Sequence, residues 1–318
     1  MNEQLNGISE IRVFAPATVS NVGCGFDIFG FALDQPGDEV ILRVAKRKGI
    51  RLVKITGDNG KLPLSISKNT CTVALSAMME KLNLNFGIEV ELHKKMPLGS
   101  GLGSSAASAV AGIFALNSIL KKPVTTHELL PFALEGERIS SGATVHADNV
   151  APALFGGFVL VRSNNPVDII SIPIPKDFYC TVLHPFMEIK TDYARSILPK
   201  TIAVQDAIKQ WGNTAGLVAG LMKRDYDLVR RSITDYFAEP VRSELIPGYK
   251  QIKEAVKMYD AFGFGISGSG PSLFALSRTK LDALKIGNIM KKVLYQTTKI
   301  ESDIFIGGIN LYGPKILG

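Results

Sequence analysis

Three glycines at every second position and two adjacent serines mark the segment PLGSGLGSSAAS, residues 97–108. Glycines leave room for an anion to approach the main chain closely. The N–H groups at the start of a helix carry partial positive charge and have no partner within the helix. The hydroxyls of Ser104 and Ser105 can add contacts to a phosphate oxygen or a magnesium ion. The segment therefore predicts a phosphate-binding loop.

Two better-known phosphate-binding motifs do not match this segment. A Walker loop has a lysine before its serine or threonine, and residues 97–108 contain no lysine. The dinucleotide-binding fingerprint has a third glycine where Ser104 stands. A flexible loop before a helix packed closely on a sheet is the structural alternative. Three glycines, two serines and a strand-to-helix context together favour phosphate binding.

The composition indicates a soluble globular protein. The chain has 318 residues, of which 46% are hydrophobic and 20% charged, and this length fits one large or two medium domains. The formal net charge of +7 suits an anionic substrate. Lysines and arginines are scattered without interleaved aromatic residues, so we expect no nucleic-acid partner.

The cysteines and the N-terminal residues bear on the compartment. Cys24, Cys71 and Cys180 are far apart and odd in number, which favours a reducing compartment. The first residues, MNEQLNGISEIRV, lack the apolar core of a signal peptide. The most apolar stretch, residues 106–120, is too short to span a bilayer. We therefore expect a cytoplasmic protein without a membrane partner.

The pattern of apolar residues predicts mixed helices and strands without strict alternation. Alternation predicts strands at residues 11–15, 40–44, 51–55, 88–92, 157–162, 179–183 and 303–311, with a strand pair over 262–276. Helical spacing predicts helices at 107–120, 126–139, 203–222, 228–236, 249–259 and 281–294. Residues 143–152 are expected to form a polar loop and residues 172–177 a linker. This order favours an α+β fold over a doubly wound sheet.

The glycine-rich segment resembles the central motif of the GHMP kinase superfamily, which includes galactokinase, homoserine kinase and mevalonate kinase. The two other motifs of that superfamily follow in the expected order, APATVSNVGCGFDIFGFAL at residues 15–33 and GISGSGPSLFAL at residues 265–276. The resemblance implies that the third motif braces the nucleotide loop. It also implies that ATP is bound by Pro97, Leu98, Gly99, Ser100, Gly101, Leu102, Gly103, Ser104, Ser105, Ala106 and Ala107.

The same resemblance implies a two-domain α+β kinase fold. Residues 1–170 would form the N-terminal domain, which is similar to ribosomal protein S5 and carries the phosphate-binding loop. Residues 171–318 would form a C-terminal ferredoxin-like α/β sandwich. The nucleotide would lie between the two domains.

Three further segments resemble the homoserine kinases within this superfamily. They are VHADNVAPALFGGF at residues 145–158, TDYARSILP at 191–199 and EPVRSELIPGY at 239–249. The resemblance implies ATP-dependent phosphorylation of the side-chain hydroxyl of L-homoserine to O-phospho-L-homoserine, a step toward threonine. ATP and magnesium are the implied cofactors, and ATP and L-homoserine the small-molecule partners. Dimers are common among such relatives, so a homodimer is left open.

Homoserine is a zwitterion with a terminal hydroxyl, and the matched segments supply groups of the right kinds. The carboxylate of Asp27 suits the ammonium group, and the guanidinium forks of Arg195 and Arg242 suit the carboxylate. Asn149 and Asn21 are candidates for the hydroxyl. His146 is also expected to line the acceptor pocket. Turn chemistry for Asn21 and Asp27, and surface charge for the two arginines, are the structural alternatives.

Phosphoryl transfer needs mainly alignment and charge neutralisation. We expect Ser105 and one glutamate of residues 126–139 to bind the metal. Glu135 and Glu137 compete for this role, and Glu137 matches the family pattern better. Asn149, Arg242 and Asp148 are the candidate catalytic residues. Whether Asp148 acts as a base or shapes its loop is left open.

Two other functions fit parts of the sequence. A GHMP kinase for another small alcohol, such as mevalonate, would share the three motifs, but such acceptors have no ammonium group for Asp27. A non-catalytic nucleotide-binding regulator would share the fold. The presence of both Ser105 and Glu137 argues against the regulator.

Overall fold

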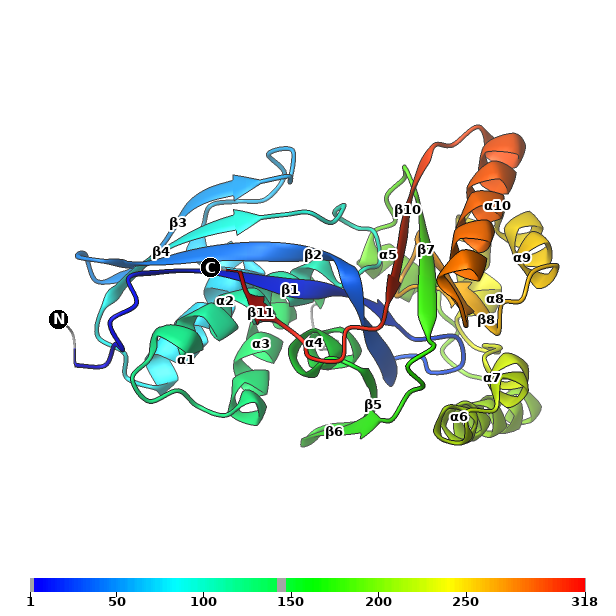
Figure 1. Cartoon of the computed structure of the whole chain (residues 1–318), viewed down its shortest axis with the longest axis horizontal. Coiled ribbons are helices and arrows are strands. Elements are labelled where there is room, and N and C mark those ends of the chain that lie inside the picture. Colours follow the sequence, from blue (N-terminus) through cyan, green and yellow to red (C-terminus); the bar gives the residue numbers. More distant parts are fainter. Residues whose placement is uncertain (1–2, 142–146, 318) are drawn as a thin grey trace.

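Two β-sheets lie side by side along the long axis of the molecule (Figure 1). The computed structural model describes residues 3–141 and 147–317. The larger sheet has the strand order β11-β1-β2-β4-β3, with β5 added to β2 and β6 added to β5. Its strands are β1 (Glu10–Ser20), β2 (Phe29–Ala45), β3 (Gly49–Thr56), β4 (Gly87–His93), β5 (Phe158–Asn164), β6 (Val167–Ile172) and β11 (Lys315–Ile316).

Four helices cover one face of the larger sheet (Figure 1). They are α1 (Thr70–Lys81), α2 (Ser104–Ile119), α3 (Thr126–Ser141) and α4 (Ala147–Phe155). The central helix, α2, is buried on nearly all sides, and its small residues allow close packing. A Cβ atom at Gly112 would lie 2.6 Å from the Sγ atom of Cys71 on α1. The small residues after the glycine-rich segment therefore serve the core.

The smaller sheet has the strand order β10-β7-β9-β8. Its strands are β7 (Tyr179–Pro185), β8 (Gly263–Ile266), β9 (Leu273–Ser277) and β10 (Ser302–Gly308). The remaining helices are α5 (Thr191–Ser196), α6 (Val204–Lys223), α7 (Tyr226–Ser232), α8 (Glu239–Arg242), α9 (Tyr249–Lys257) and α10 (Lys280–Thr298), with short 3₁₀ turns at Ile66–Lys68 and Ser243–Leu245. Residues of α9 and α10 form a second apolar core with β7 and β9.

The α+β fold expected from the sequence is confirmed, and so is the order strand, glycine loop, helix around residues 97–103. The expected boundary between residues 170 and 171 lies within β6, which belongs to the larger sheet. The C-terminal strand β11 also pairs with β1 of the larger sheet. The division into residues 1–170 and 171–318 therefore stays a prediction.

The polar loop expected over residues 143–152 is wrong from Ala147 onward, because α4 begins there. Asp148, Asn149 and Pro152 are typical of turns, and they led to that expectation. Val150 and Leu154 are buried in the main core, and this packing outweighs the local preference for a turn. Helix α1 was also not predicted. In the part of the chain that the structure describes, no helix has both the length and the apolar character needed to cross a membrane.

Candidate active site

The three glycine-containing motifs meet around one cavity of about 490 Å³. Asn21 and Asp27 of the first motif line it, as do residues 98–105 of the second and Gly268 and Ser269 of the third. Side chains from α3, α4, α5 and α8 complete the wall. Segments more than 200 residues apart in the sequence therefore build a single site.

The second motif forms a tight loop between β4 and α2. Gly103 has a left-handed backbone with φ of 65° and immediately precedes α2. A Cβ atom at Gly103 would lie 2.1 Å from the hydroxyl of Thr18, and one at Gly101 would lie 2.3 Å from the carbonyl of Ser267. Glycine is therefore required at both positions for contact with the neighbouring motifs.

The first and third motifs hold this loop through the main chain. The N–H of Thr18 donates to the carbonyl of Leu102 at 3.0 Å, and the hydroxyl of Ser267 donates to the carbonyl of Gly101 at 2.7 Å. The N–H of Gly268 donates to the carbonyl of Ser20 at 3.1 Å. The third motif therefore contacts the glycine-rich loop, as expected for a segment that braces the nucleotide loop.

Among the described residues, no side chain caps the N-terminus of α2. The first turn contains no acidic residue either, so the partial positive charge of the helix end is not compensated there. A helix end of this kind, next to a glycine-rich loop and facing a cavity, suits a phosphate group. Ala106 and Ala107 of the predicted ATP-binding set are buried in α2 and serve its packing.

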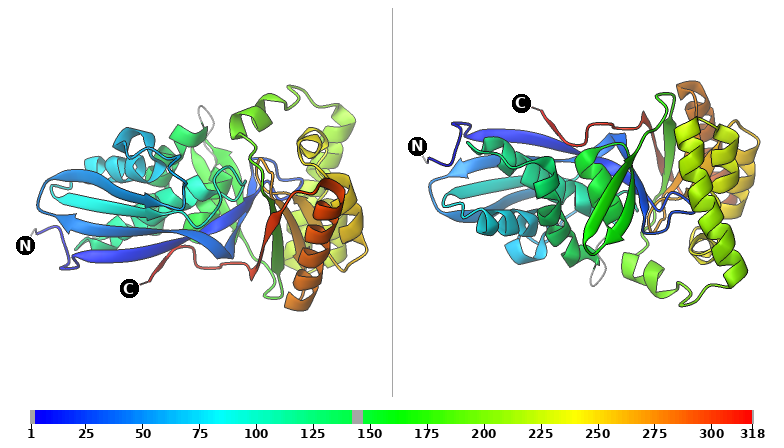
Figure 2. Two further views of the ribbon diagram at one scale, coloured as in Figure 1. Left: turned by 90° about the horizontal axis from the view of Figure 1, so that it is seen from above. Right: turned by 90° about the horizontal axis from the view of Figure 1, so that it is seen from below.

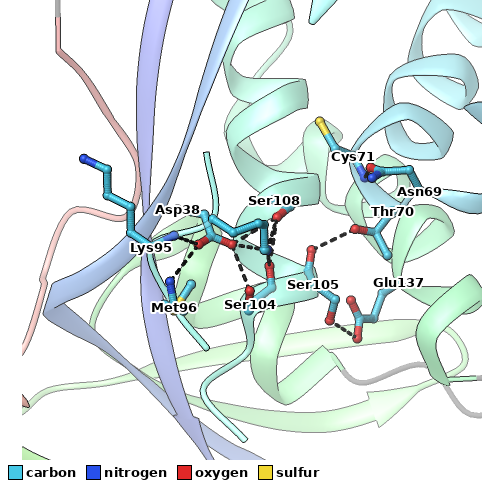
Figure 3. Close-up of polar contacts among 11 residues, drawn as sticks. Asp38, Asn69, Thr70, Cys71, Lys95, Met96, Ser104, Ser105, Ser108 and Glu137 are labelled. Carbon is cyan, nitrogen blue, oxygen red and sulfur yellow. Dashed lines mark hydrogen bonds and ion pairs between the residues drawn. The ribbon is translucent and has the colours of Figure 1, made fainter. Parts of the chain in front are cut away.

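A buried ion pair contacts the first turn of α2, and Figure 3 shows its acidic member, Asp38, beside Ser104 and Ser108. Lys94, which follows β4, pairs with Asp38 of β2 with both side chains almost fully buried. The Lys94 ammonium group also donates to the carbonyl of Ser104 at 2.8 Å and to the hydroxyl of Ser108 at 2.6 Å. The Ser104 hydroxyl in turn donates to Asp38 at 2.9 Å.

Sequence reasoning missed this ion pair. The loop lacks the Walker lysine, but Lys94 stands at its base, three residues before Pro97. Asp38 lies 56 residues earlier in the chain, and antiparallel pairing of β2 with β4 brings the two together. Lys94 stands between His93 and Lys95, and Asp38 stands beside Glu39, so neither was singled out, and their pairing could not be identified without the strand register.

The predicted metal ligands lie in contact (Figure 3). The hydroxyl of Ser105 donates to Oε1 of Glu137 at 2.9 Å, and the hydroxyl of Thr70 donates to the carbonyl of Ser105 at 3.3 Å. Glu137 is buried at the cavity wall. Glu135, its competitor, is half exposed and pairs with Arg138 at 2.9 Å. A hydroxyl and a carboxylate oxygen beside a phosphate loop suit Mg²⁺, which usually takes few protein ligands in addition to substrate phosphates.

On the acceptor side, Asp27 and Arg195 form a bidentate ion pair. The two guanidinium nitrogens lie 3.0 and 3.1 Å from the carboxylate oxygens. The side chain of Asn21 shapes the turn, since it accepts from the N–H of Asp27 at 3.0 Å and donates to the carbonyl of Gly268 at 2.8 Å. The two side chains assigned to the ammonium group and to the carboxylate of homoserine thus contact one another in this structure.

Arg242 is buried beside this pair. Its guanidinium donates to the carbonyls of Ala194 at 3.2 Å and Gly268 at 3.0 Å. It lies 5.1 Å from the centre of the Phe26 ring, and Arg195 lies 5.7 Å from the same ring. Burial lowers the pKa of Arg242 to about 10, while the negative charge of Asp27 acts in the opposite direction. Arg242 therefore keeps its charge at neutral pH.

Asp148 and Asn149 lie next to each other at the start of α4, on the wall of the cavity. Asn149 accepts from the hydroxyl of Thr18 at 2.8 Å and donates to the hydroxyl of Ser20 at 3.0 Å. Asp148 is buried, and its Oδ1 atom has no hydrogen-bond partner in residues 3–141 and 147–317. Burial, followed by the negative charge of Asp27, raises the pKa of Asp148 to about 7.

Other predicted features have a mixed outcome. His146 lies outside the described residues. Some of the basic residues line the cavity, namely Lys61, Lys68, Lys94, Arg195 and Arg242. In the described part of the chain, no group of three or more His, Cys, Asp or Glu side chains could hold a metal ion. A metal here would thus depend on phosphate oxygens as well as on Ser105 and Glu137.

Family models and known proteins match the chain along most of its length. The model for the GHMP kinases N terminal domain matches residues 69–157, and that for the GHMP kinases C terminal matches residues 217–296. A homoserine kinase of Chlorobium phaeobacteroides is 45% identical, with 96% of this chain and 98% of the relative covered. One of Xanthomonas campestris pv. campestris is 39% identical, with 98% and 95% covered.

Solved structures agree with these matches. The crystal structure of homoserine kinase from Cytophaga hutchinsonii has 52% sequence identity and a TM-score of 0.95, with 98% of each chain covered. The L. major mevalonate kinase in complex with R-mevalonate has a TM-score of 0.70 at 15% identity, with 94% of this chain and 95% of that chain covered. The second likeness extends to the fold alone.

Proposed function

This chain belongs to the homoserine kinases of the GHMP kinase superfamily, and from that membership we propose how its cavity transfers the γ-phosphoryl group of ATP to L-homoserine. The product is O-phospho-L-homoserine, which lies on the route to threonine. The observation that carries the proposal is the meeting of Asp27, Arg195 and Arg242 beside the phosphate-binding loop in one cavity.

The acceptor end of the cavity has the charges that a zwitterionic amino acid requires. We assign the ammonium group of homoserine to Asp27 and its carboxylate to Arg195 and Arg242. The existing ion pair between Asp27 and Arg195 supports this assignment, because it already holds one anion and one cation at that end. The ligand would add its own opposite charges to a preformed pair, so little side-chain ordering is needed on binding.

Asn149 and Asn21 are assigned to the acceptor side near the hydroxyl. The side chain of Asn149 is held by Thr18 and Ser20, so its orientation is fixed before the substrate arrives. The first turn of α2 lies within the same cavity wall, and it is assigned to the phosphates of ATP. Fixed positions on both sides favour the in-line arrangement that phosphoryl transfer needs.

Ser105 and Glu137 are assigned to Mg²⁺. When bound, this ion would neutralise negative charge on the phosphates of ATP. The buried Arg242 remains charged at neutral pH and can stabilise charge that develops on the transferred group. The shifted pKa of Asp148 lets its carboxyl accept a proton near pH 7. Its burial equally suits a role in shaping the start of α4, and the two roles make different predictions below.

Several further expectations stay proposals. They are cytoplasmic location, the absence of nucleic-acid and membrane partners, the two-domain division and a homodimer. A non-catalytic regulator is disfavoured, because both proposed metal ligands and the acceptor charges are present together. A kinase for mevalonate is disfavoured by the same acceptor charges, since mevalonate has a carboxylate but no ammonium group.

A panel of acceptors tests the proposed function. ADP release is measured by a coupled assay with L-homoserine, mevalonate and galactose, for the wild type and for Asp27→Asn. We expect turnover with L-homoserine, and a kcat/KM for it that falls at least about 100-fold in Asp27→Asn, because a charged partner of the ammonium group is lost. Asp192→Asn, an exposed neighbour in α5, is the control and leaves kcat/KM unchanged. No stimulation by homoserine would contradict the proposal.

A further inference from the structure

One aromatic ring contacts both arginines at the acceptor end of the cavity. The centre of the Phe26 ring lies 5.1 Å from the guanidinium carbon of Arg242 and 5.7 Å from that of Arg195. Both distances lie within the range of about 6 Å over which the face of an aromatic ring attracts a cation. Both arginines line the cavity, whereas Phe26 is not part of its lining. The ring can therefore act on a bound substrate through the arginines and not by direct contact.

The ring stabilises two like charges that lie in a confined space. Arg242 is only 4% exposed. Burial, and to a smaller extent the positive charge of Arg195, lowers the pKa of Arg242 to about 10. The negative face of an aromatic ring offsets part of the cost of holding buried cations close together, and it does so without accepting a hydrogen bond from their N–H groups.

Arg242 consequently keeps donors for an anionic ligand. Its Nε atom donates to the carbonyl of Ala194 at 3.2 Å, and its Nη1 atom donates to the carbonyl of Gly268 at 3.0 Å. The Nη2 atom donates to none of the residues that the structure describes. A guanidinium group held by its face and by part of its edge can still present the remaining N–H groups to a carboxylate.

The Phe26 ring is itself held in place by the turn that leads into α8. It meets the ring of Phe237 edge to face, with 5.1 Å between the centres and 68° between the planes. The carboxylate of Asp235 accepts from the N–H groups of Phe237 and Glu239, each at 2.8 Å. Helix α8 ends at Arg242. The same turn thus supports the ring and the helix that carries one of the guanidinium groups in contact with the ring.

We propose that Phe26 is a positioning residue whose ring orients Arg195 and Arg242 toward the carboxylate of the acceptor, and that it thereby sets the preference for acceptors that carry a carboxylate. This inference rests on the proposed assignment of that carboxylate to the two arginines. Asp27, the next residue in the chain, pairs with Arg195 and is assigned to the ammonium group. Two adjacent residues of the first motif would thus serve the two charged groups of the substrate, Asp27 directly and Phe26 through the arginines.

Two acceptors separate recognition of the carboxylate from the rest of the reaction, because 3-aminopropanol is L-homoserine with a hydrogen in place of the carboxylate. Phe26→Leu keeps an apolar side chain but removes the aromatic face. In this variant we expect the KM for L-homoserine to rise at least about tenfold, with kcat and the KM for ATP within about threefold of the wild type. The kcat/KM for 3-aminopropanol should also stay within about threefold, because that acceptor has no carboxylate to be held.

Two further variants complete the experiment. Phe26→Tyr keeps an aromatic face and should keep a KM for L-homoserine within about threefold of the wild type. Phe305→Leu is the matched control, since Phe305 is partly buried in β10 and does not line the cavity, and it should leave both acceptors unchanged.

Three results would overturn the role of Phe26 while leaving the kinase activity itself in place. They are equal kinetics of Phe26→Leu and Phe305→Leu, equal kinetics of Phe26→Leu and Phe26→Tyr, and an equal fall in kcat/KM for both acceptors in Phe26→Leu. A wild type that does not phosphorylate L-homoserine would instead contradict the proposed function, and this inference with it.

Discussion

At the scale of single residues, the account depends on the contact between Ser105 and Glu137. These residues come from different helices, and their hydrogen bond of 2.9 Å brings a hydroxyl and a buried carboxylate to the start of the phosphate loop. Glu135 differs by only two positions in the sequence, but it points to Arg138 and solvent. Residues two positions apart point in different directions around a helix, so Glu137 faces the cavity whereas Glu135 forms a surface ion pair.

Glu137→Gln and Glu135→Gln form a matched pair of variants. We expect kcat to fall at least about 100-fold in Glu137→Gln, because a carboxylate near the transferred charge is replaced by a neutral amide. The magnesium concentration that gives half-maximal rate should also increase. Glu135→Gln should stay within about twofold of the wild type, because its side chain is exposed. Steady-state kinetics over a magnesium titration measures both effects, and equal behaviour of the two variants would refute the assignment.

The buried carboxyl of Asp148 predicts how the stability of the protein changes with pH. Its pKa is raised to about 7 in the folded protein, so the folded state keeps a proton that the unfolded state releases near pH 4. The contribution of this group to stability is therefore fully present below about pH 4 and is lost as the pH rises toward 7. In Asp148→Asn this loss of stability with rising pH is absent, because the amide does not titrate. The free energy of unfolding of this variant, relative to the wild type, should increase by more than about 1 kcal/mol between pH 4.5 and 7.5.

Urea unfolding of both proteins at these two pH values measures the difference, and a constant difference would show that the Asp148 carboxyl is not shifted. The turnover of Asp148→Asn with homoserine separates the two proposed roles. A fall of about 100-fold or more indicates a proton acceptor. Near-normal turnover indicates that Asp148 shapes the start of α4.

At the scale of elements, the first turn of α2 is held by the buried Lys94–Asp38 pair. Removing one member of such a pair leaves an uncompensated buried charge, which typically costs about 3–5 kcal/mol. We expect Asp38→Asn to lower the free energy of unfolding by that amount, and to raise the KM for ATP because the Asp38 carboxylate no longer accepts from Ser104. The exposed pair Arg162–Asp168 provides the control, since Asp168→Asn should cost less than about 1 kcal/mol. Urea unfolding measures both losses, and a cost for Asp38→Asn no larger than the control would contradict this role.

Local sequence predicted the elements around the loop better than it predicted α1 and α4. Strand β4, the loop and α2 carry strong signals, namely alternation, alternating glycines and a long apolar run. Helix α4 begins with polar residues and contains Pro152, so local preference favours a turn. Its helical state depends on the burial of Val150 and Leu154 against the sheet, and such tertiary packing is not visible in a local window.

At the scale of the whole molecule, the three motifs and their convergence could be predicted from the sequence through the family resemblance, and the family and the α+β fold are confirmed. The sequence did not predict that Asp27 pairs with Arg195 or that Asp38 pairs with Lys94. Each pair joins residues 56 or more positions apart, and only sheet register and helix packing bring them together.

The central claim is that one cavity holds ATP on the loop of residues 97–105 and homoserine between Asp27 and the two arginines. A crystal structure with a non-hydrolysable ATP analogue, magnesium and L-homoserine tests it most directly. The account predicts phosphates at the first turn of α2, a metal ion in contact with Ser105 and Glu137, and the homoserine hydroxyl directed at the γ-phosphate. Phosphates bound away from the glycine loop, or a homoserine whose ammonium group does not contact Asp27, would contradict it.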